Sequence, residues 1–163
     1  MPAFDLSIIE FSDDLAPHFY DINAQWIEAM FVMEPHDRHV LEHPRQTVID
    51  PGGVILFVSS AELGIVGACA LMKTDEDSFE LTKMGVLESA RGKKAGDFLL
   101  IHMIARARAM GVKTLYLLTN HICESAIHLY EKHGFEHSEA IMLAYGLRYA
   151  RSDVAMAYNF DRR

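Results

Sequence analysis

The sequence predicts a single mixed α/β domain, and three observations predict it. Residues 54–87 hold three apolar segments of strand length that are separated by short turns. Residues 92–110 and 123–133 have the length and apolar spacing of helices, and a strand-like segment follows each of them. Strands in a run form an antiparallel meander, whereas a strand–helix–strand connection adds a strand by a crossover. We therefore expect one mixed sheet that is packed against helices.

The N-terminal part is predicted to hold one strand and two helices. FDLSIIEF, residues 4–11, has the apolar content of a strand. Between residues 15 and 33, apolar side chains recur with the helical period, which predicts a helix with one buried stripe. We expect Pro35 to end this helix, and a short second helix, residues 37–43, to stop at Pro44.

The next strands form the meander. Their predicted ranges are residues 54–60, 65–73 and 78–87. Pro51-Gly52-Gly53, Leu63-Gly64 and an acidic loop, residues 75–77, supply the turns around them.

Helices and strands alternate in the rest of the chain. A helix over residues 92–110 ends at Gly111, a usual place for glycine. The elements predicted after it are strand 114–120, helix 123–133, strand 135–138 and strand 154–160. The apolar segment EAIMLAYGLRYA, residues 139–150, is ambiguous between the two kinds of element.

Composition limits the classes of protein. The 163 residues fit one domain, residues 1–163, and half of them are hydrophobic, so we expect a sizeable core. No run approaches the 18 apolar residues of a membrane span. The acidic start lacks the plan of a signal peptide, and two distant cysteines suit a reducing compartment. We expect a cytoplasmic protein without a membrane partner.

The net charge of −8 argues against a nucleic acid partner, because phosphates are repelled unless a basic face is set apart. The same acidity mildly favours cationic acceptors such as amines.

A turn between a predicted strand and a predicted helix has the character of a phosphate site. Arg91-Gly92-Lys93-Lys94-Ala95-Gly96 opens a helix, where free N–H groups and the helix dipole attract anions. It is not the NTPase loop, because six residues separate Gly85 from Gly92 and no Ser or Thr follows the lysines. Nor are the three glycines of a dinucleotide fingerprint present.

This segment resembles the acyl-CoA loop of the GCN5-related N-acetyltransferases. In that family a strand ending in Val precedes Arg/Gln-x-x-Gly-x-Gly/Ala and a helix. Val86, Arg91 and Gly96 match the pattern, whereas Lys94 stands in place of the middle glycine. If that position requires a positive φ, a non-glycine residue costs about 1–2 kcal/mol. The alternative is that Lys93 and Lys94 are only a solvated basic pair.

A second block strengthens the resemblance. It follows the predicted strand TLYLLTN and consists of Ala126, Ile127, Leu129, Tyr130, Lys132, Gly134 and Phe135. The resemblance implies the N-acetyltransferase fold, a mostly antiparallel sheet whose fourth and fifth strands splay apart around the pantetheine arm of CoA.

The resemblance also implies how acetyl-CoA is held. Main-chain amides of residues 91–96 would bind the pyrophosphate, and the backbone of Met84 and Val86 would pair with pantetheine. Asn120 matches a family residue near the cofactor; alternatively, it caps the helix that starts near Cys123.

Two side chains are candidates for proton transfer. Glu80 lies six residues before Val86, where the family often places a basic carboxylate; alternatively, it pairs with Lys83 or lies at the rim. Tyr130 matches the family tyrosine near the CoA sulfur, and a phenol can protonate the departing thiolate. Its alternative role is core packing.

The sequence says less about the acceptor site than about the cofactor site. Trp26, Phe31 and Glu34 are candidates for acceptor contacts, although the spacing of both aromatic residues also fits the core. Arg151 beside Tyr149 could clamp an acceptor carboxylate; the simpler reading is a solvated arginine next to Asp153.

A metal site is not expected. His36, His39 and His43 have helix-like spacing and acidic neighbours, as metal ligands can have. Acetyl transfer to an amine does not call for a metal, however.

We therefore expect an enzyme that moves an acetyl group from acetyl-CoA to a primary amine by direct attack within a ternary complex. The alternatives are a CoA-binding sensor without turnover and an acyltransferase that acts on a protein or peptide amine. A homodimer formed through residues 139–150 is a further expectation. The sequence does not identify the acceptor.

Overall fold

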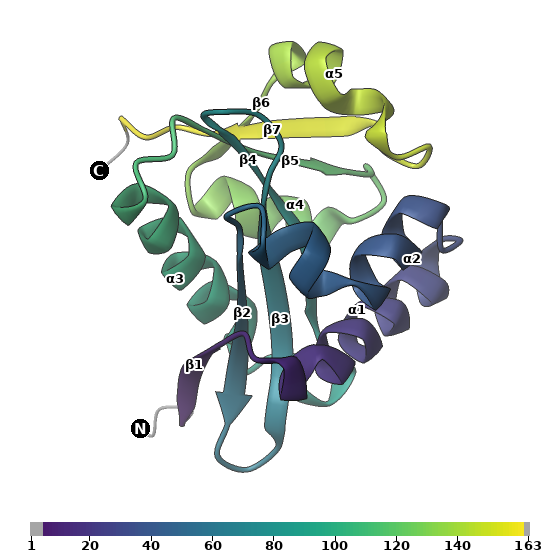
Figure 1. Ribbon diagram of the computed structural model, residues 1–163, viewed down its shortest axis with the longest axis vertical. Coiled ribbons are helices and arrows are strands. Elements are labelled where there is room, and N and C mark those ends of the chain that lie inside the picture. The colour runs from purple at the N-terminus through teal and green to yellow at the C-terminus, as the bar shows by residue number, and fades with distance from the viewer. Residues whose placement is uncertain (1–4, 162–163) are drawn as a thin grey trace.

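A computed structural model describes residues 5–161, in which seven strands form one sheet in the order β1-β2-β3-β4-β5-β7-β6 (Figure 1). The strands are β1 (Leu6–Glu10), β2 (Val54–Ser60), β3 (Gly64–Lys73), β4 (Ser78–Val86), β5 (Thr114–Thr119), β6 (Phe135–His137) and β7 (Val154–Tyr158). All neighbouring pairs are antiparallel except β4 and β5. The predicted mixed sheet and its antiparallel meander are confirmed.

Helices cover both faces of the sheet. The α-helices are α1 (Ala16–Met30), α2 (Pro35–Glu42), α3 (Ala95–Ala109), α4 (Glu124–Lys132) and α5 (Glu139–Tyr145); the short helical turns are η1 (Asp13–Leu15), η2 (Arg45–Ile49), η3 (Glu88–Ala90) and η4 (Gly146–Arg148). Side chains alternate across each strand, so Leu56 of β2 packs in the core with α3, while Phe57 packs with α1 and α2. In Figure 1, α5 lies over β7.

The two central strands separate soon after they meet. β4 and β5 pair in parallel only from Ser78 to Glu80, opposite Thr114 to Tyr116. Beyond that point β5 pairs with β7, from Tyr116 to Thr119. The second half of β4 therefore has one unpaired edge, as the resemblance implied for the fourth and fifth strands.

A β-bulge lies on this same half of β4. Ala68 faces Gly85 and Ala70 faces Thr82, so two residues of β4 stand against one of β3. Lys83 fills the extra position with a left-handed φ of 51°. A bulge interrupts the alternation of side chains, and Thr82 and Lys83 both reach the tyrosine Tyr149 on the α1/α2 side of the sheet.

Several boundaries differ from the sequence-based expectations. The expectation that Pro35 ends the first helix is wrong: α1 already ends at Met30, and Pro35 occupies the first turn of α2, where a missing N–H costs nothing. The helix expected from residue 92 begins at Ala95, because residues 91–94 form the turn. η2, a π-helical turn, was not predicted. The expected start of the first strand at residue 4 lies outside the described residues.

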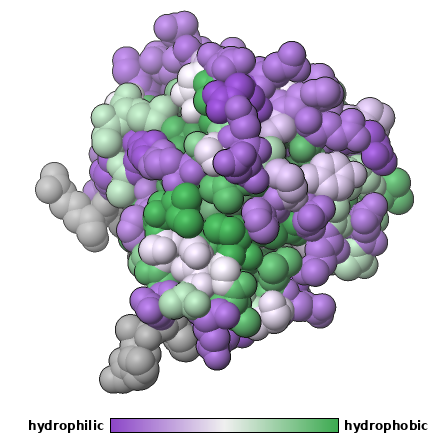
Figure 2. Space-filling view, turned by 60° about the horizontal axis from the view of Figure 1, so that its bottom comes forward, coloured by the Kyte–Doolittle hydropathy of each residue, from purple (hydrophilic) through white to green (hydrophobic). Residues whose placement is uncertain are grey.

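The ambiguous segment, residues 139–150, forms α5 and η4. Leu143 is 83% exposed and Leu147 is 101% exposed, so two apolar side chains project from this part of the surface. Figure 2 shows hydrophobic residues gathered in the middle of one face of the molecule and bordered by hydrophilic ones. A homodimer through residues 139–150 stays a prediction.

Within residues 5–161, the helices are all too short or too polar to cross a membrane.

Candidate active site

A cavity of about 740 Å³ occupies the space between the separated strands. Its walls come from β4, β5, the turn before α3, the start of α4, the end of α1 and the segment before β7. The lining includes Trp26, Met30, Phe31, residues 81–86, residues 90–92 and 94–97, residues 117–120, residues 122–126, Leu129, Tyr130, Tyr149, Arg151 and Ser152.

One end of the cavity is the turn that opens α3. Gly92 has a φ of 84°, and Lys94, the N-cap of the helix, has a φ of 63°. The residue in place of the family's middle glycine therefore does adopt a left-handed conformation, at a cost of about 1–2 kcal/mol. No side chain caps this helix, so its first N–H groups remain open to a ligand.

Gly96 lets α3 approach its neighbours closely. A Cβ atom there would lie 3.3 Å from Cδ2 of Leu129 and 3.9 Å from Cε of Met84. A larger side chain would push against α4 and β4 together, where the start of α3 meets the open edge of β4.

The open edge of β4 presents main-chain groups to the cavity. The N–H of Leu87 donates to the carbonyl of Val66 on β3, at 2.8 Å. Because successive N–H groups alternate between the two edges of a strand, those of Val86 and Met84 point away from β3, toward the cavity. Both residues line it.

Tyr130 of α4 lies in the cavity wall and is 9% exposed. Its ring packs edge-on against Phe135, with the ring centres 5.8 Å apart. Burial raises the pKa of the Tyr130 phenol, and the nearby thiols of Cys69 and Cys123 raise it further. The phenol therefore stays protonated at neutral pH and can act as a proton donor. Its alternative role, core packing, is compatible with the same position.

Asn120 at the end of β5 is held by its own hydrogen bonds. Its Nδ2 donates to the carbonyl of Arg151 at 2.8 Å, and its Oδ1 accepts from the N–H of Ile122 at 3.0 Å. Cys123 is the N-cap of α4, so the capping role considered for Asn120 is wrong. Asn120 instead ties β5 to the segment before β7 while it lines the cavity.

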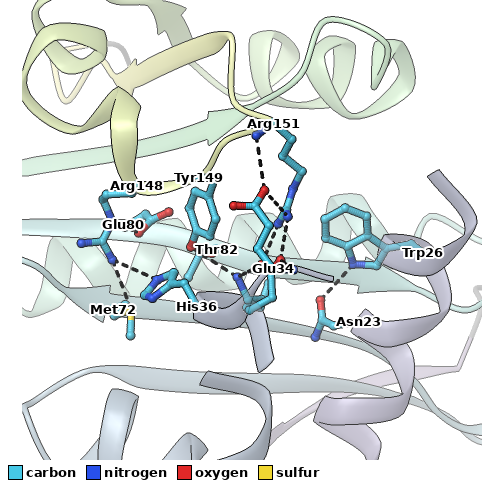
Figure 3. Close-up of polar contacts among 12 residues, drawn as sticks. Asn23, Trp26, Glu34, His36, Met72, Glu80, Thr82, Arg148, Tyr149 and Arg151 are labelled. Carbon is cyan, nitrogen blue, oxygen red and sulfur yellow. Dashed lines mark hydrogen bonds and ion pairs between the residues drawn. The ribbon is translucent and has the colours of Figure 1, made fainter. Parts of the chain in front are cut away.

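The other end of the cavity contains a cluster of charged side chains (Figure 3). Lys83 Nζ donates to Asp37 Oδ1 at 3.0 Å and to the Tyr149 hydroxyl at 3.3 Å. Arg151 donates to both oxygens of Asp37, at 2.6 and 2.7 Å, and to Glu34 Oε2 at 3.2 Å. Figure 3 shows Tyr149 between the side chains of Arg148 and Arg151.

Burial makes these ion pairs mutually dependent. Asp37 is fully buried and Lys83 is 4% exposed. Burial alone would raise the pKa of Asp37, but the hydrogen bond from Arg151 and the charge of Lys83 hold it well below its usual range. Burial likewise opposes the charge of Lys83, yet Tyr149 and Asp37 raise its pKa above the ordinary value. Both groups are therefore charged at neutral pH.

Glu80 lies behind the cavity. It is 1% exposed, is not among the cavity-lining residues, and has Oε1 3.2 Å from Nε of Arg148. These two atoms lack a hydrogen bond of good geometry. Burial raises the pKa of the Glu80 carboxyl, and Arg148 and Lys83 offset only part of the rise. A general-base role for Glu80 stays a prediction. Its expected alternative partner, Lys83, pairs with Asp37 instead.

Trp26 and Phe31 both line the cavity and are half-buried. Their rings meet edge-on, 6.5 Å apart, and Trp26 Nε1 donates to Oδ1 of Asn23. Glu34 does not line the cavity; it holds Arg151 and the N–H of Ala150. Arg151 is only 15% exposed at its side chain and pairs with these acids, so the simpler reading of it as a solvated arginine is wrong.

The histidines do not form a metal site. The His36 ring is tilted against that of Tyr149, and its Nε2 lies 3.4 Å from Nη2 of Arg148, while the rings of His39 and His43 are tilted against each other. Burial, together with the charges of Lys83 and Arg148, lowers the pKa of His36 to about 4. Within residues 5–161, the side chains that could ligate a metal do not gather into groups of three or more.

Sequence reasoning missed Asp37 and Lys83 as members of the site. A lysine inside an apolar central strand was the available signal, because such a cation must find a buried partner. The partner, 46 residues earlier in the chain, could not be read from spacing.

Known proteins resemble this chain in sequence and in structure. A family model described as an acetyltransferase (GNAT) domain matches residues 52–137. A protein of Escherichia coli K12 named uncharacterized N-acetyltransferase YjgM is 41% identical over 71 residues, which are 44% of this chain and 42% of that protein. An amino-acid acetyltransferase of Pseudomonas syringae pv. tomato is 36% identical over 101 residues, 61% of this chain and 21% of that protein. This chain thus spans less than half the length of either relative.

Solved structures share the fold. A GNAT-family acetyltransferase from Staphylococcus aureus Mu50 superposes with a TM-score of 0.84 at 20% identity, over 94% of this chain and 98% of the other. N-acetylglutamate synthase from Neisseria gonorrhoeae, complexed with coenzyme A and N-acetyl-glutamate, superposes with a TM-score of 0.70 at 20% identity, over 99% of this chain and 36% of the other. The family model covers more than half of the sequence, and the chain belongs to the GNAT family of acetyltransferases.

Proposed function

We propose that this protein transfers an acetyl group from acetyl-CoA to the primary amine of a small molecule, by direct attack within a ternary complex. The observation that carries the proposal is the single cavity that joins the open start of α3, the unpaired edge of β4 and the cluster around Lys83 and Arg151. Both substrates can occupy such a cavity at the same time. Relatives named amino-acid acetyltransferases support a small amine as the acceptor.

In this proposal acetyl-CoA lies along β4. The amides of residues 91–96 hold the pyrophosphate, Arg91 and Lys94 add positive charge, and Lys93 contributes its amide. The backbone of Met84 and Val86 on the open strand edge pairs with the amides of the pantetheine arm. Coenzyme A in complexes of proteins with the same fold supports this assignment.

The reaction is an exchange of one acyl bond for another. The lone pair of the neutral amine attacks the thioester carbonyl, and the N–H of Val86 stabilises the oxyanion that forms. The C–S bond then breaks, and the Tyr130 phenol gives its proton to the departing thiolate. The nitrogen gives up one proton and is left as an amide. Alignment of the two substrates supplies a large part of the rate enhancement.

The proton lost by the amine needs a route to a base. Glu80 has a raised pKa, which suits a proton acceptor, but its carboxylate lies behind the cavity wall. Tyr149 lies beside Glu80 and does line the cavity. In this proposal Glu80 therefore acts through the Tyr149 hydroxyl or through water.

The test is acetyl-CoA turnover, measured as free thiol, with polyamines, amino acids, aminoglycosides and short peptides as acceptors. We expect thiol release with at least one small amine. A thermal shift with CoA but no thiol release with any amine would overturn the proposal in favour of a CoA sensor. Release only with peptides would point to a protein acyltransferase.

A further inference from the structure

The charges at the acceptor end of the cavity are arranged unevenly. Lys83 and Arg151 line the cavity, whereas the acids that compensate them, Glu34 and Asp37, do not. The acidic residues that do line the cavity, Asp97 and Glu124, belong to the first turns of α3 and α4. A ligand at the acceptor end therefore meets the partly exposed Arg151 guanidinium, while Lys83 and Asp37 are buried behind the cavity surface.

These cations keep hydrogen-bonding capacity. A guanidinium has five N–H donors, and Arg151 uses three bonds on Asp37 and Glu34. An ammonium has three donors, and Lys83 uses two of them, on Asp37 and Tyr149. Arg151, whose side chain is 15% exposed, can thus donate to a further acceptor without giving up the bonds that hold it in place. The side chain of Lys83 is only 2% exposed, so it contributes mainly its charge.

The cavity wall next to Arg151 is apolar. Trp26, Met30 and Phe31 from the end of α1 line it, and the Arg151 guanidinium lies 5.6 Å from the centre of the Phe31 ring. A charged group and an apolar group of one small ligand would therefore find matching surfaces side by side.

We propose that the amine acceptor carries a carboxylate, which Arg151 binds with support from the charge of Lys83, and an apolar side chain, which packs on Trp26 and Phe31. This inference rests on the proposed acetyl transfer and names its substrate class: apolar α-amino acids and close analogues. A purely cationic amine such as a polyamine would bring its charges against Lys83 and Arg151, which disfavours binding.

The experiment compares matched acceptors on the intact protein. L-phenylalanine is paired with L-phenylalaninamide and L-methionine with L-methioninamide, and spermidine serves as the cationic acceptor. The readout is kcat/KM from thiol release. We expect each acid to exceed its amide by ten-fold or more, mainly through KM, since charged hydrogen bonds are lost with the amide. The amino group of the amide is less basic than that of the acid, so at a given pH a larger fraction of the amide is the reactive neutral amine. A faster reaction of the acid therefore cannot result from a larger fraction of neutral amine.

Variants connect the preference to the named residues. Arg151→Gln should lower the ratio of acid to amide at least five-fold by raising KM for the acid, with a smaller effect on the amide. Arg38→Gln is the matched control, because Arg38 is exposed on α2 and pairs with Glu42 at 3.6 Å. The acid-to-amide ratio of this variant should equal that of the wild type. If Arg151→Gln does not fold, Arg151→Lys retains the charge without the planar fork and should keep an intermediate ratio.

The possible failures are distinguishable. Equal or faster turnover of the amides or of spermidine by the wild type would overturn the carboxylate inference while acetyl transfer stands. An unchanged ratio in Arg151→Gln would overturn the assignment to Arg151. Absence of thiol release with every acceptor, with CoA still bound, would overturn the proposed function itself.

Discussion

The two ends of the cavity are built by different means. At the start of α3, the proposed CoA end, open main-chain N–H groups are held by a short turn and by the close approach that Gly96 allows. The proposed acceptor end consists of side chains from α2, β4 and the segment before β7, joined by buried ion pairs such as Lys83–Asp37. The first end depends on backbone shape within one stretch of chain. The second depends on charge balance among distant segments.

This difference predicts that a single substitution lowers the stability of the fold most at the acceptor end, where buried charges depend on one another. Asp37→Ala should lower the free energy of unfolding by about 3–5 kcal/mol, because it leaves Lys83 and Arg151 buried without their partner. Denaturant titration followed by circular dichroism measures this. Asp13→Ala is the control: its bond to Arg45 is exposed, and its loss should cost about 1 kcal/mol or less. Equal losses in the two variants would contradict a charge-balanced acceptor end.

The same carboxylate should make stability depend on acid. The pKa of Asp37 is depressed in the folded protein, so its contribution is present above its unfolded value and is lost as pH falls through the folded value. We expect this group to account for about 2 kcal/mol of the fall in unfolding free energy between pH 6 and strongly acidic pH. Denaturant titrations at several pH values measure it. Asp37→Asn should flatten that part of the curve; an unchanged acid dependence would exclude Asp37 as its source.

At the proposed CoA end, the largest effect on binding should come from a bulkier side chain at Gly96. Gly96→Leu should raise the Kd for CoA by ten-fold or more, because its side chain would press on Leu129 and Met84. Isothermal titration calorimetry measures this affinity. Ala105→Leu, on an exposed face of the same helix, is the control and should bind CoA as the wild type does. Unchanged affinity in Gly96→Leu would mean that CoA does not lie at this turn.

A substitution at Tyr130 tests whether this side chain takes part in catalysis or only packs in the core. Tyr130→Phe removes the hydroxyl and keeps the ring contact with Phe135. We expect kcat to fall ten-fold or more while the Kd for CoA changes little, because the thiolate loses its proton donor. Steady-state turnover together with calorimetry separates the two quantities. Turnover equal to that of the wild type would leave Tyr130 with a packing role.

The contrast between the two ends also explains what the sequence could predict. The strands, the helices and the turn at residues 91–96 follow from local signals: apolar periodicity, glycines, and a motif within one stretch of chain. The bulge at Lys83 and its pairing with Asp37 depend on register between strands and on packing of α2, which no local pattern encodes. The overall acidity favoured cationic acceptors, whereas the proposed acceptor carboxylate rests on one local feature, the Arg151 guanidinium in the cavity wall.

The smallest expected effect concerns the one place where the CoA end departs from the family pattern. Lys94 has a φ of 63°, so Lys94→Gly should relieve backbone strain and stabilise the protein by about 1 kcal/mol. The same change removes a cation beside the proposed pyrophosphate, so CoA should bind more weakly, by about two- to five-fold. Thermal denaturation and calorimetry measure these two effects. Lys93→Gly is the control, since Lys93 is not in the left-handed region and glycine there should bring no gain in stability. Higher stability with unchanged CoA affinity would show that Lys94 binds only through its main chain, as is proposed for Lys93.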